Sequence, residues 1–413
     1  MATSLNVGIV GGSIAGCAAA ILLRRAGHEV TVFERTTGKL QGRGGGIATP
    51  RTTFGTLVDE DIIDADFPHT QVREMPFIGR VAPHDRWGRT AWTLPVDLIC
   101  FHWGTLWENL RSRVPDHDYH QGCEVTGVRG SDGNAVELQL DGRTPSTFDL
   151  VLFADGYRSL GRRLQQPNAE LRYRGYVLWR GLLPESRVKE SSLLAGKMPR
   201  LSYAHADGHL VTYLVPGLEG ATEPGSRLYN WAAYLAVPEE ELPALLIDSH
   251  GLAHEGSLPP GSVRAETEQR FKALMAANLP AYFADIISST ENTYIQLIYT
   301  ADVKAYAHHR TCLLGDAGSV VQPFTISGVF KGFHNARDLV QTLARPGSVD
   351  AALADWSQRQ SSRSQRILAW GAQMEQALIW DPLDFGSADA ATTEAWWRTK
   401  VARDESFGYE QTL

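Results

Sequence analysis

The amino-terminal segment alternates between apolar runs and a turn rich in glycine. Residues 7–10 form an apolar run, as in a buried strand, and residues 30–33 form a second one. Between them, residues 14–26 carry apolar side chains at helical spacing. This order predicts a strand, a helix and a second strand, which together make a βαβ unit with parallel strands.

Two later segments each place a glycine–aspartate pair at the end of a predicted strand. Residues 148–164 predict a strand that ends at Asp155-Gly156 and turns towards Arg162, and residues 311–343 predict a buried strand, a turn at Gly315-Asp316, a loop with a proline and a helix. Glycine there lets the backbone approach a ligand in the crevice where α/β sheets bind cofactors.

Alternating apolar and polar residues dominate the interval between these segments. Runs such as HLVTYLVPG and LYNWAAYLAV predict antiparallel strands between about residues 175 and 298. Helical spacing then covers residues 355–377, and residues 393–413 are expected to form a final helix and tail.

Composition restricts the class of protein. At 413 residues the chain is expected to form two domains, and 43 % hydrophobic with 21 % charged residues is typical of a globular protein. The net charge is −8 and no run of lysine and arginine occurs, so nucleic acid is not an expected partner. No apolar stretch reaches 18 residues and no signal peptide is evident, which predicts a cytoplasmic protein without membrane insertion.

Four cysteines are spread along the chain without the spacing of a metal site. Cys17, Cys100, Cys123 and Cys312 each lie among apolar neighbours. They are therefore expected to be buried reduced thiols, neither disulfides nor metal ligands, and no metal site is predicted.

The first glycine turn has the chemistry of a dinucleotide site. Gly11 and Gly16 occupy the outer positions of a G-x-G-x-x-G fingerprint, Ser13 takes the middle one, and Glu34 follows 18 residues after Gly16. The glycines permit a tight turn and close helix packing, Ser13 is small enough for its amide to face a phosphate, and Glu34 is placed to accept hydrogen bonds from a ribose. A glycine-rich turn in a nucleotide-free α/β protein remains the alternative, and this segment alone does not separate flavin from nicotinamide.

Taken in order, the three turns resemble the fingerprints of the class A, single-component FAD-dependent aromatic monooxygenases, over nearly the whole chain. The resemblance implies a bound FAD, with Asp316 on its ribityl chain and Asp155 behind its pyrophosphate. The helix entered at residues 327–329 is expected to direct amides at negative charge on the reduced flavin. Asp316 as a mere turn cap is the alternative.

Further stretches, among them VGGSIAG, GRGGGIATP and YRGYVLWRGL, resemble the 2,6-dihydroxypyridine 3-hydroxylase-like branch, which also has the serine in the first turn. Two departures are visible: residues 330–334 put bulk and charge where the family commonly has Gly-x-Asn or Gly-x-Ala, and His102 or Trp103 stands where many relatives have an arginine. The residues that the resemblance and the motifs assign to the cofactor are Gly11, Ser13, Ile14, Ala15, Gly16, Glu34, Arg35, Arg43, Gly45, Ile47, Trp103, Asp155, Gly315, Asp316, Gly328 and Val329.

Aromatic residues of the middle segment are candidates for an apolar pocket that holds a planar ring. Ordinary packing within a sheet is the alternative for each of them, and no catalytic base is assigned. The candidate substrate residues are Trp179, Tyr203, His205, Tyr213, Pro323 and Phe324.

The expected architecture is an α/β fold in which a Rossmann-like FAD-binding domain is interleaved with a substrate domain built on a mixed β-sheet, followed by C-terminal helices. The expected boundaries are residues 1–70, 100–175 and 299–370 for the first domain, 71–99 and 176–298 for the second, and 371–413 for the helical segment.

The resemblance implies that NADH or NADPH, as a transient reductant, reduces FAD, that O2 forms a flavin C4a-hydroperoxide, and that its distal oxygen hydroxylates an electron-rich aromatic or heteroaromatic small molecule. A monomer or homodimer is expected. The alternatives are a Baeyer-Villiger-type or epoxidising enzyme acting on a polycyclic metabolite, and a flavin- or ligand-binding protein without turnover.

Overall fold

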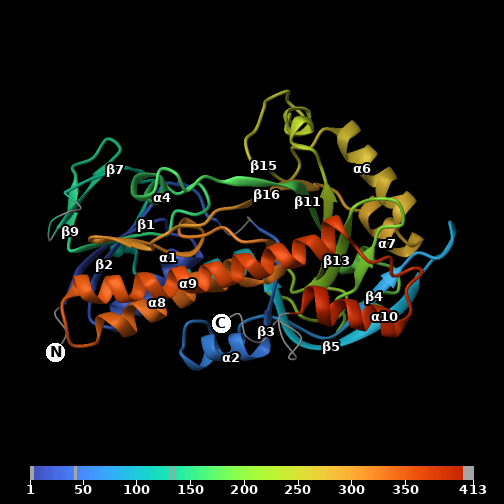
Figure 1. Cartoon of the computed structure of the whole chain (residues 1–413), viewed down its shortest axis with the longest axis horizontal. Coiled ribbons are helices and arrows are strands. Elements are labelled where there is room, and N and C mark those ends of the chain that lie inside the picture. Colours follow the sequence, from blue (N-terminus) through green and yellow to red (C-terminus); the bar gives the residue numbers. More distant parts are fainter. Residues whose placement is uncertain (1–3, 41–43, 131–132, 134, 403–413) are drawn as a thin grey trace.

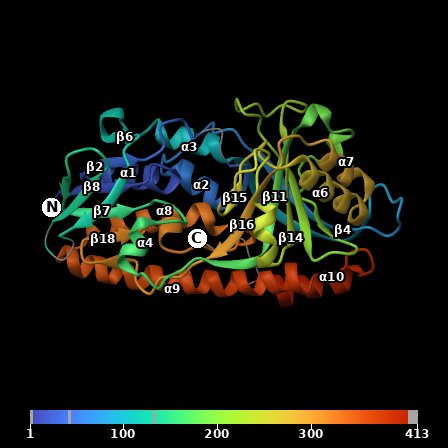
Figure 2. The same ribbon diagram turned by 90° about the horizontal axis from the view of Figure 1, so that it is seen from above.

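The computed structural model describes residues 4–40, 44–130, 133 and 135–402. Figure 1 shows a parallel sheet with its helices in one half of the molecule and a larger sheet in the other, and helix α9 (Val349–Glu375) runs along both halves. Figure 2 shows from above that α9 keeps to one side over its whole length. Within the described residues, no helix has the length and apolar character needed to cross a membrane.

The first half is built on a six-stranded sheet with the strand order β17-β18-β10-β1-β2-β6. Neighbouring strands are parallel except for the antiparallel pair β17 and β18. The predicted βαβ unit is confirmed, because helix α1 (Ile14–Arg25) connects β1 to β2. The strands are β1 (Asn6–Val10), β2 (Glu29–Glu34), β6 (Tyr119–Gln121), β10 (Leu150–Phe153), β17 (Ala307–His308) and β18 (Thr311–Leu313).

Helices pack on one face of this sheet and a small sheet covers the other. Helix α1 packs against α3 (Trp103–Arg111) and α8 (Ser327–Leu343), while β7 (Val125–Arg129), β8 (Val136–Leu140) and β9 (Ser146–Phe148) form the three-stranded sheet. A Cβ at Gly8 would lie 2.8 Å from the Phe148 ring, so the small sheet approaches β1 closely. The short helix α4 (Leu160–Gln165) follows β10.

The second half is built on a nine-stranded sheet with the order β15-β16-β11-β14-β13-β12-β4-β5-β3. Its pairs are antiparallel except for β12 with β4. The predicted antiparallel strands are confirmed, and β3 to β5 join them from the amino-terminal part of the chain. The strands are β3 (Gly46–Pro50), β4 (Thr70–Gly79), β5 (Arg89–His102), β11 (Arg172–Pro184), β12 (Arg200–Ser202), β13 (Gly208–Val215), β14 (Leu228–Ala236), β15 (Ser257–Leu258) and β16 (Tyr294–Thr300).

The nine-stranded sheet has an outer face and an inner face. Helices α6 (Ala265–Asn278) and α7 (Ala281–Ser288) cover the outer face, where Trp179 stacks on Phe271 at 4.1 Å between ring centroids. The inner face packs against the carboxyl end of α9 and α10 (Ala390–Trp396). Because side chains alternate along a strand, neighbouring residues of β11 point to opposite faces.

The carboxyl-terminal helices partly match their predictions. Helix α9 begins at Val349, six residues before the predicted start, where the Ser348 hydroxyl accepts a hydrogen bond from the Ala351 N–H at 3.2 Å. The expected final helix begins earlier, as α10, and residues 403–413 lie outside the described residues. All four cysteines are buried free thiols, as predicted. Within the described residues, the remaining α-helices are α2 (Arg51–Asp59) and α5 (Leu242–Leu245).

A buried ion pair holds two connections of the second half together. Arg227 donates to both carboxylate oxygens of Glu185 at 2.6 and 2.7 Å, and Glu185 is 1 % exposed. Burial opposes ionisation of this carboxyl group, but Arg227 and the Gly225 N–H hold the pKa of Glu185 below its usual range. Removing one partner of such a pair leaves a buried uncompensated charge.

We therefore expect Arg227→Met to lower the free energy of unfolding by about 3–5 kcal/mol, measured by urea denaturation. Arg187→Met is the matched control, because the ion pair of Arg187 with Glu291 is 47 % and 73 % exposed; its expected cost is below about 1 kcal/mol. Equal losses in the two variants would contradict the assigned role of burial.

Candidate cofactor and substrate site

The turn from β1 into α1 depends on close backbone contact. Gly11 has φ 102°, and a Cβ there would lie 2.4 Å from the Ala154 carbonyl oxygen at the end of β10. A Cβ at Gly16 would lie 1.8 Å from the Gly11 carbonyl oxygen. Ser13 caps α1 without a side-chain hydrogen bond, so its hydroxyl and the first amides of the helix, including those of Ile14 and Ala15, are available to an anion.

Glu34 lies at the end of β2 with its carboxylate fixed by backbone amides. Its Oε2 accepts from the Gly12 N–H and its Oε1 from the Thr36 N–H, each at 2.8 Å, and the side chain is buried. Each oxygen keeps a further lone pair for a ligand hydroxyl. The neighbouring Arg35 is exposed. Contact of Glu34 and Arg35 with a cofactor stays a prediction.

Asp155 follows β10 and carries a buried oxygen atom without a partner. Its Oδ2 accepts from the Leu160 N–H at 2.6 Å, whereas no group in the described part of the chain hydrogen-bonds the buried Oδ1. Burial raises the pKa of this carboxyl group. An unsatisfied buried acceptor is costly, so this atom fits a site completed by a ligand.

Arg162 connects the turn after β10 with the turn after β18. Its Nη1 donates to the carbonyl oxygens of Asp316 and Ala317 at 2.8 and 3.2 Å, and its Nη2 donates to that of Tyr157. The Asp316 side chain is 42 % exposed and forms an ion pair with the buried ammonium group of Lys331 from α8. The sequence indicated only that Lys331 puts a charge near the turn at Asp316. It did not predict the ion pair, because the two residues lie on different elements.

Open space lies in front of the first turn of α8. Gly328 is exposed, and no atom lies within 4 Å of the position that a Cβ would take there. Val329 is half-buried beside it. Gly315, with φ 59°, lies against Ala15 of α1, so α1, α8 and the turn after β18 meet at one place. The start of α8 is therefore open to solvent at Gly328, beside the place where α1 and the turn after β18 meet.

The segment before β3 lies against α3 and β11. A Cβ at Gly44 would lie 2.7 Å from the Trp103 Cβ, and the Trp103 N–H donates to the Gly45 carbonyl oxygen at 3.0 Å. A Cβ at Gly45 would lie 2.6 Å from Nη2 of Arg180. Ile47 continues this segment and is half-buried in β3. Arg43 lies outside the described residues.

A polar cluster on the inner face surrounds Gly45 and Gly46, and it was not predicted from the sequence. Arg180 Nη2 donates to the Gly46 carbonyl oxygen at 3.0 Å, and the Gly46 N–H donates to Asn230 Oδ1 at 2.8 Å. Buried Arg180 Nε, Asn230 Nδ2 and Tyr294 Oη have no hydrogen-bond partner in the described part of the chain. The available signal was a charged residue inside the apolar run YVLWRGLL.

His102 lies close to this cluster and is held neutral. Burial, together with the positive charge of Arg180, lowers its pKa to about 4. Its Nδ1 accepts a hydrogen bond from the Gly104 N–H at 3.1 Å. The neutral ring therefore carries its proton on Nε2 and is a donor there.

Half of the predicted substrate residues lie on the inner face. Tyr213 Cε2 would be 2.9 Å from a Cβ at Gly46, and Phe324, from the turn that starts at half-buried Pro323, stacks on Tyr176 at 6.1 Å between centroids. Their contact with a substrate stays a prediction.

The other three predicted substrate residues are not brought to the inner face. Trp179 stacks on Phe271 of α6, and Tyr203 packs in the same outer core. His205 is exposed, and its backbone N–H donates to Asn278 of α6, on the outer side of the sheet. Aromatic character alone did not reveal the face, because the face depends on strand register.

Comparison with known proteins agrees with this geometry. A family model described as an NAD(P)-binding Rossmann-like domain matches residues 9–55, and one described as FAD binding domain-like matches residues 173–300. The chain is 27 % identical over 376 residues to the 2,6-dihydroxypyridine 3-monooxygenase of Paenarthrobacter nicotinovorans. The aligned region covers 89 % of each chain.

Solved structures share the fold over nearly the full length. The structure of 2,6-dihydroxypyridine-3-hydroxylase from Arthrobacter nicotinovorans superposes with a TM-score of 0.83 at 24 % identity, covering 94 % of this chain and 95 % of that one. Klebsiella pneumoniae HpxO complexed with FAD and uric acid gives a TM-score of 0.72 at 17 % identity, covering 96 % and 92 %. Similarity to a monooxygenase along almost all of both chains, together with the matches to FAD- and NAD(P)-binding family models, supports a flavoprotein monooxygenase.

Proposed function

We propose that the protein hydroxylates a small electron-rich aromatic or heteroaromatic molecule that carries an ionisable ring hydroxyl, with NAD(P)H and O2 as co-substrates. The observation that carries this proposal is the polar cluster on the inner face. It places one guanidinium, one amide and two phenol groups, with three unpartnered polar atoms, beside Gly45 and Gly46. Relatives named for hydroxylated pyridine and salicylate substrates support the class of ring.

The described residues fit a bound FAD. The amides at the start of α1 suit its pyrophosphate, Glu34 its adenosine ribose, Asp316 its ribityl chain and the start of α8 its ring. When bound, FAD takes electrons from NAD(P)H and activates O2, chemistry that no side chain supplies. The unpartnered Asp155 Oδ1 and the open space at Gly328 support this placement.

The protein's own contribution is to bind, orient and ionise the substrate. Arg180 stabilises a ring oxyanion, because a guanidinium in a partly buried site interacts strongly with an anion. Tyr213, Tyr294 and Asn230 offer hydrogen bonds that fix the plane and direction of the ring. Neutral His102 donates from Nε2 and is therefore a positioning group in this arrangement. The aromatic residues of the inner face, including Phe324, exclude water from the ring.

The role of Asp316 in holding FAD is tested by Asp316→Ala. We expect the dissociation constant of FAD to rise about 10- to 100-fold, because hydrogen bonds to a charged group contribute about 1.5–3 kcal/mol. Flavin fluorescence during titration of the FAD-stripped protein measures this value. The matched control is Asp350→Ala, since Asp350 forms an ion pair with Arg310 and is 66 % exposed. Unchanged FAD affinity in Asp316→Ala would remove this residue from the cofactor site.

The substrate class is tested by NAD(P)H oxidation in the presence of hydroxypyridines, phenols and their methyl ethers. The FAD-loaded protein is expected to respond to the hydroxylated ring at least tenfold more strongly than to its methyl ether, with a product one oxygen atom heavier by mass spectrometry. In Arg180→Met this preference is expected to disappear, whereas Arg180→Lys keeps part of it. Consumption of NAD(P)H without an oxygenated product from any ring would refute the proposed hydroxylation.

A further inference from the structure

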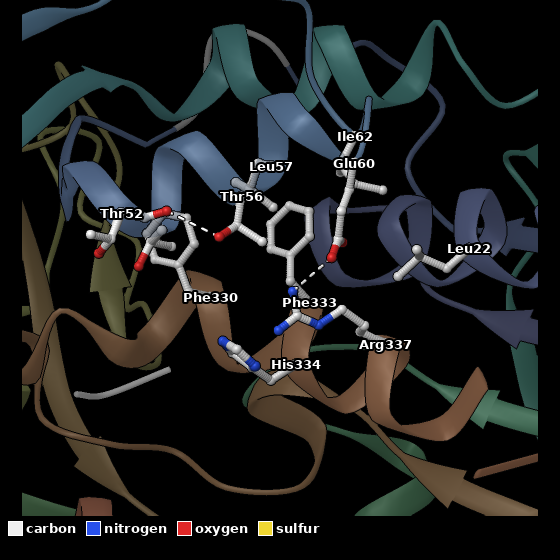
Figure 3. Close-up of a pocket in the computed structure, with 11 residues that line it drawn as sticks. Leu22, Thr52, Thr56, Leu57, Glu60, Ile62, Phe330, Phe333, His334 and Arg337 are labelled. Carbon is white, nitrogen blue, oxygen red and sulfur yellow. Dashed lines mark hydrogen bonds and ion pairs between the residues drawn. The ribbon is translucent and has the colours of Figure 1, made fainter. Parts of the chain in front are cut away.

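A cavity separate from the three cofactor turns opens between α2, α8 and α1. Its volume is about 250 Å³, and Figure 3 shows that its walls come from α2 on one side and α8 on the other. None of its lining residues belongs to the turns after β1, β10 or β18. The lining residues are Leu22, Thr52, Thr53, Thr56, Leu57, Glu60, Ile62, Phe330, Phe333, His334 and Arg337.

One side of this α2–α8 cavity is aromatic and apolar. The rings of Phe330 and Phe333 are nearly parallel, at an angle of 21° with 6.1 Å between centroids, and Leu57 lies opposite on α2. A cavity of about 150 Å³ holds benzene. The α2–α8 cavity therefore has room for one aromatic ring with a polar substituent.

The other side of the cavity is polar, with His334, Arg337 and Glu60 in its lining, while Arg363 lies close enough to act on His334 without lining the cavity. The His334 imidazole has no hydrogen-bond partner in the described part of the chain. Burial and the guanidinium groups of Arg363 and Arg337 lower its pKa to about 3. Arg363, on α9, forms neither an ion pair nor a hydrogen bond with any described residue. A neutral imidazole near an unpaired guanidinium is an environment that favours an added anion.

Arg337 is already positioned at the edge of the cavity by an acidic neighbour. Its Nη1 donates to Glu60 Oε1 at 3.0 Å, and both side chains are about one-third exposed, at 35 % and 40 %. Its other nitrogen atoms form no hydrogen bond or ion pair with the described residues and remain able to bind a carboxylate, since a guanidinium has five N–H donors.

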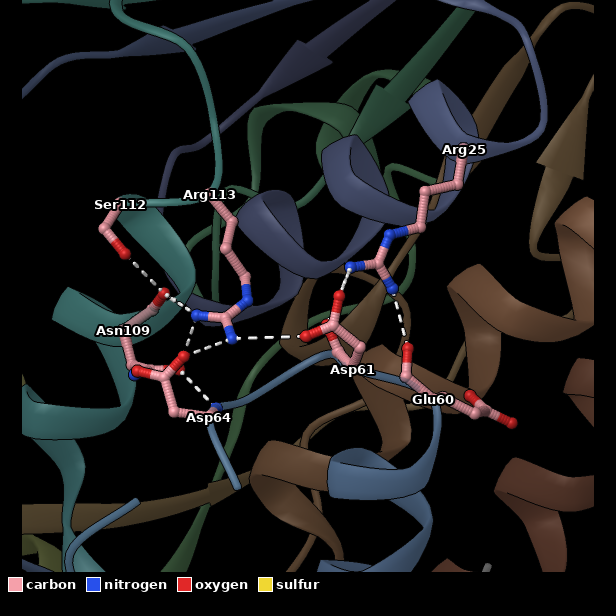
Figure 4. Close-up of polar contacts among 7 residues, drawn as sticks. All are labelled: Arg25, Glu60, Asp61, Asp64, Asn109, Ser112 and Arg113. Carbon is pink, nitrogen blue, oxygen red and sulfur yellow. Dashed lines mark hydrogen bonds and ion pairs between the residues drawn. The ribbon is translucent and has the colours of Figure 1, made fainter. Parts of the chain in front are cut away.

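Ion pairs fix the segment that forms the end wall of the cavity. Figure 4 shows Arg25 of α1 donating to the carbonyl oxygens of Glu60 and Asp61, each at 2.7 Å, and Arg113 reaching Asp61 and Asp64 from the end of α3. The segment from residue 60 to residue 64 is thus tied to two helices. The wall is in place before a ligand arrives, which lowers the entropic cost of binding.

We propose that the α2–α8 cavity binds a small aromatic carboxylate, with the ring against Phe330 and Phe333 and the carboxylate facing His334 and Arg337. This site is additional to the substrate site at Arg180, and the proposal does not depend on the reaction that the protein catalyses. The carboxylate is expected to raise the pKa of His334, so that binding is accompanied by proton uptake. Between the pKa of free His334 and the higher pKa in the complex, affinity rises by up to about tenfold for each unit by which the pH falls.

The test is isothermal titration of the FAD-loaded full chain with benzoate, and with benzamide as its neutral counterpart. We expect benzoate to bind at least tenfold more tightly than benzamide, and more tightly at pH 5 than at pH 7. Arg337→Met is expected to weaken benzoate binding at least tenfold at both pH values. His334→Gln is expected to abolish the pH dependence and the proton uptake.

Two further variants distinguish this cavity from the substrate site. Thr56→Phe fills the cavity from the partly exposed side of α2 and should abolish binding, while Thr126→Phe, on exposed β7, is the matched control that should not. Arg180→Met should leave this binding event unchanged. Absence of binding, or binding that survives Thr56→Phe but is lost in Arg180→Met, would overturn the proposal, and neither result bears on FAD binding or hydroxylation.

Discussion

The proposed cofactor crevice, formed by the turns after β1, β10 and β18, depends on one buried guanidinium. Arg162 is 2 % exposed and donates to carbonyl oxygens in two different turns, those after β10 and β18. A buried carbonyl without a donor is costly, and so is a buried guanidinium without acceptors. Arg162 therefore fixes the position of these two turns relative to each other. The third turn, which follows β1, is positioned by the turn after β10, because Gly11 lies against the carbonyl of Ala154.

Strand alternation divides the second half of the molecule into a face packed under helices and a face that carries the proposed substrate site. On β11, Trp179 enters the core under α6 while its neighbour Arg180 reaches Gly46. On β14, Asn230 and Trp231 divide in the same way, because Trp231 donates to Thr290 beside α7 and Asn230 accepts from the Gly46 N–H. The same strands thus supply both the packing that fixes the sheet and the polar groups that face the cofactor crevice.

Local sequence determines much of the first half and little of the second. The βαβ unit, the turns at Asp155 and Asp316 and the start of α8 were predictable, because glycine, aspartate and apolar periodicity act over a few residues. Arg180, Asn230 and Tyr294 were not, since they lie on three strands and meet only through sheet register. Trp179 and Tyr213 are both aromatic residues in alternating runs, and only the covering helices decide which of them faces the crevice. The division into domains stays a prediction, with β3 from the amino-terminal part joining the larger sheet.

Helix α8 connects the cofactor crevice with the α2–α8 cavity. Its preceding residue, Ile326, has φ 59°, a conformation that costs a β-branched residue roughly 1–2 kcal/mol. Contacts of the preceding residues hold this conformation of Ile326. Phe324 packs against the rings of Tyr176 and Tyr234, and Gln322 donates to Glu375 of α9 at 3.1 Å.

Contacts with the inner face and with α9 therefore fix the start of α8. The first turn of α8 cannot move without disturbing these two sets of contacts. Phe330 lines the cavity one turn after Ser327, where the amides that face the crevice begin. A displacement of α8 from the cavity side would therefore have to disturb the stacking of Phe324 and the hydrogen bond of Gln322 as well.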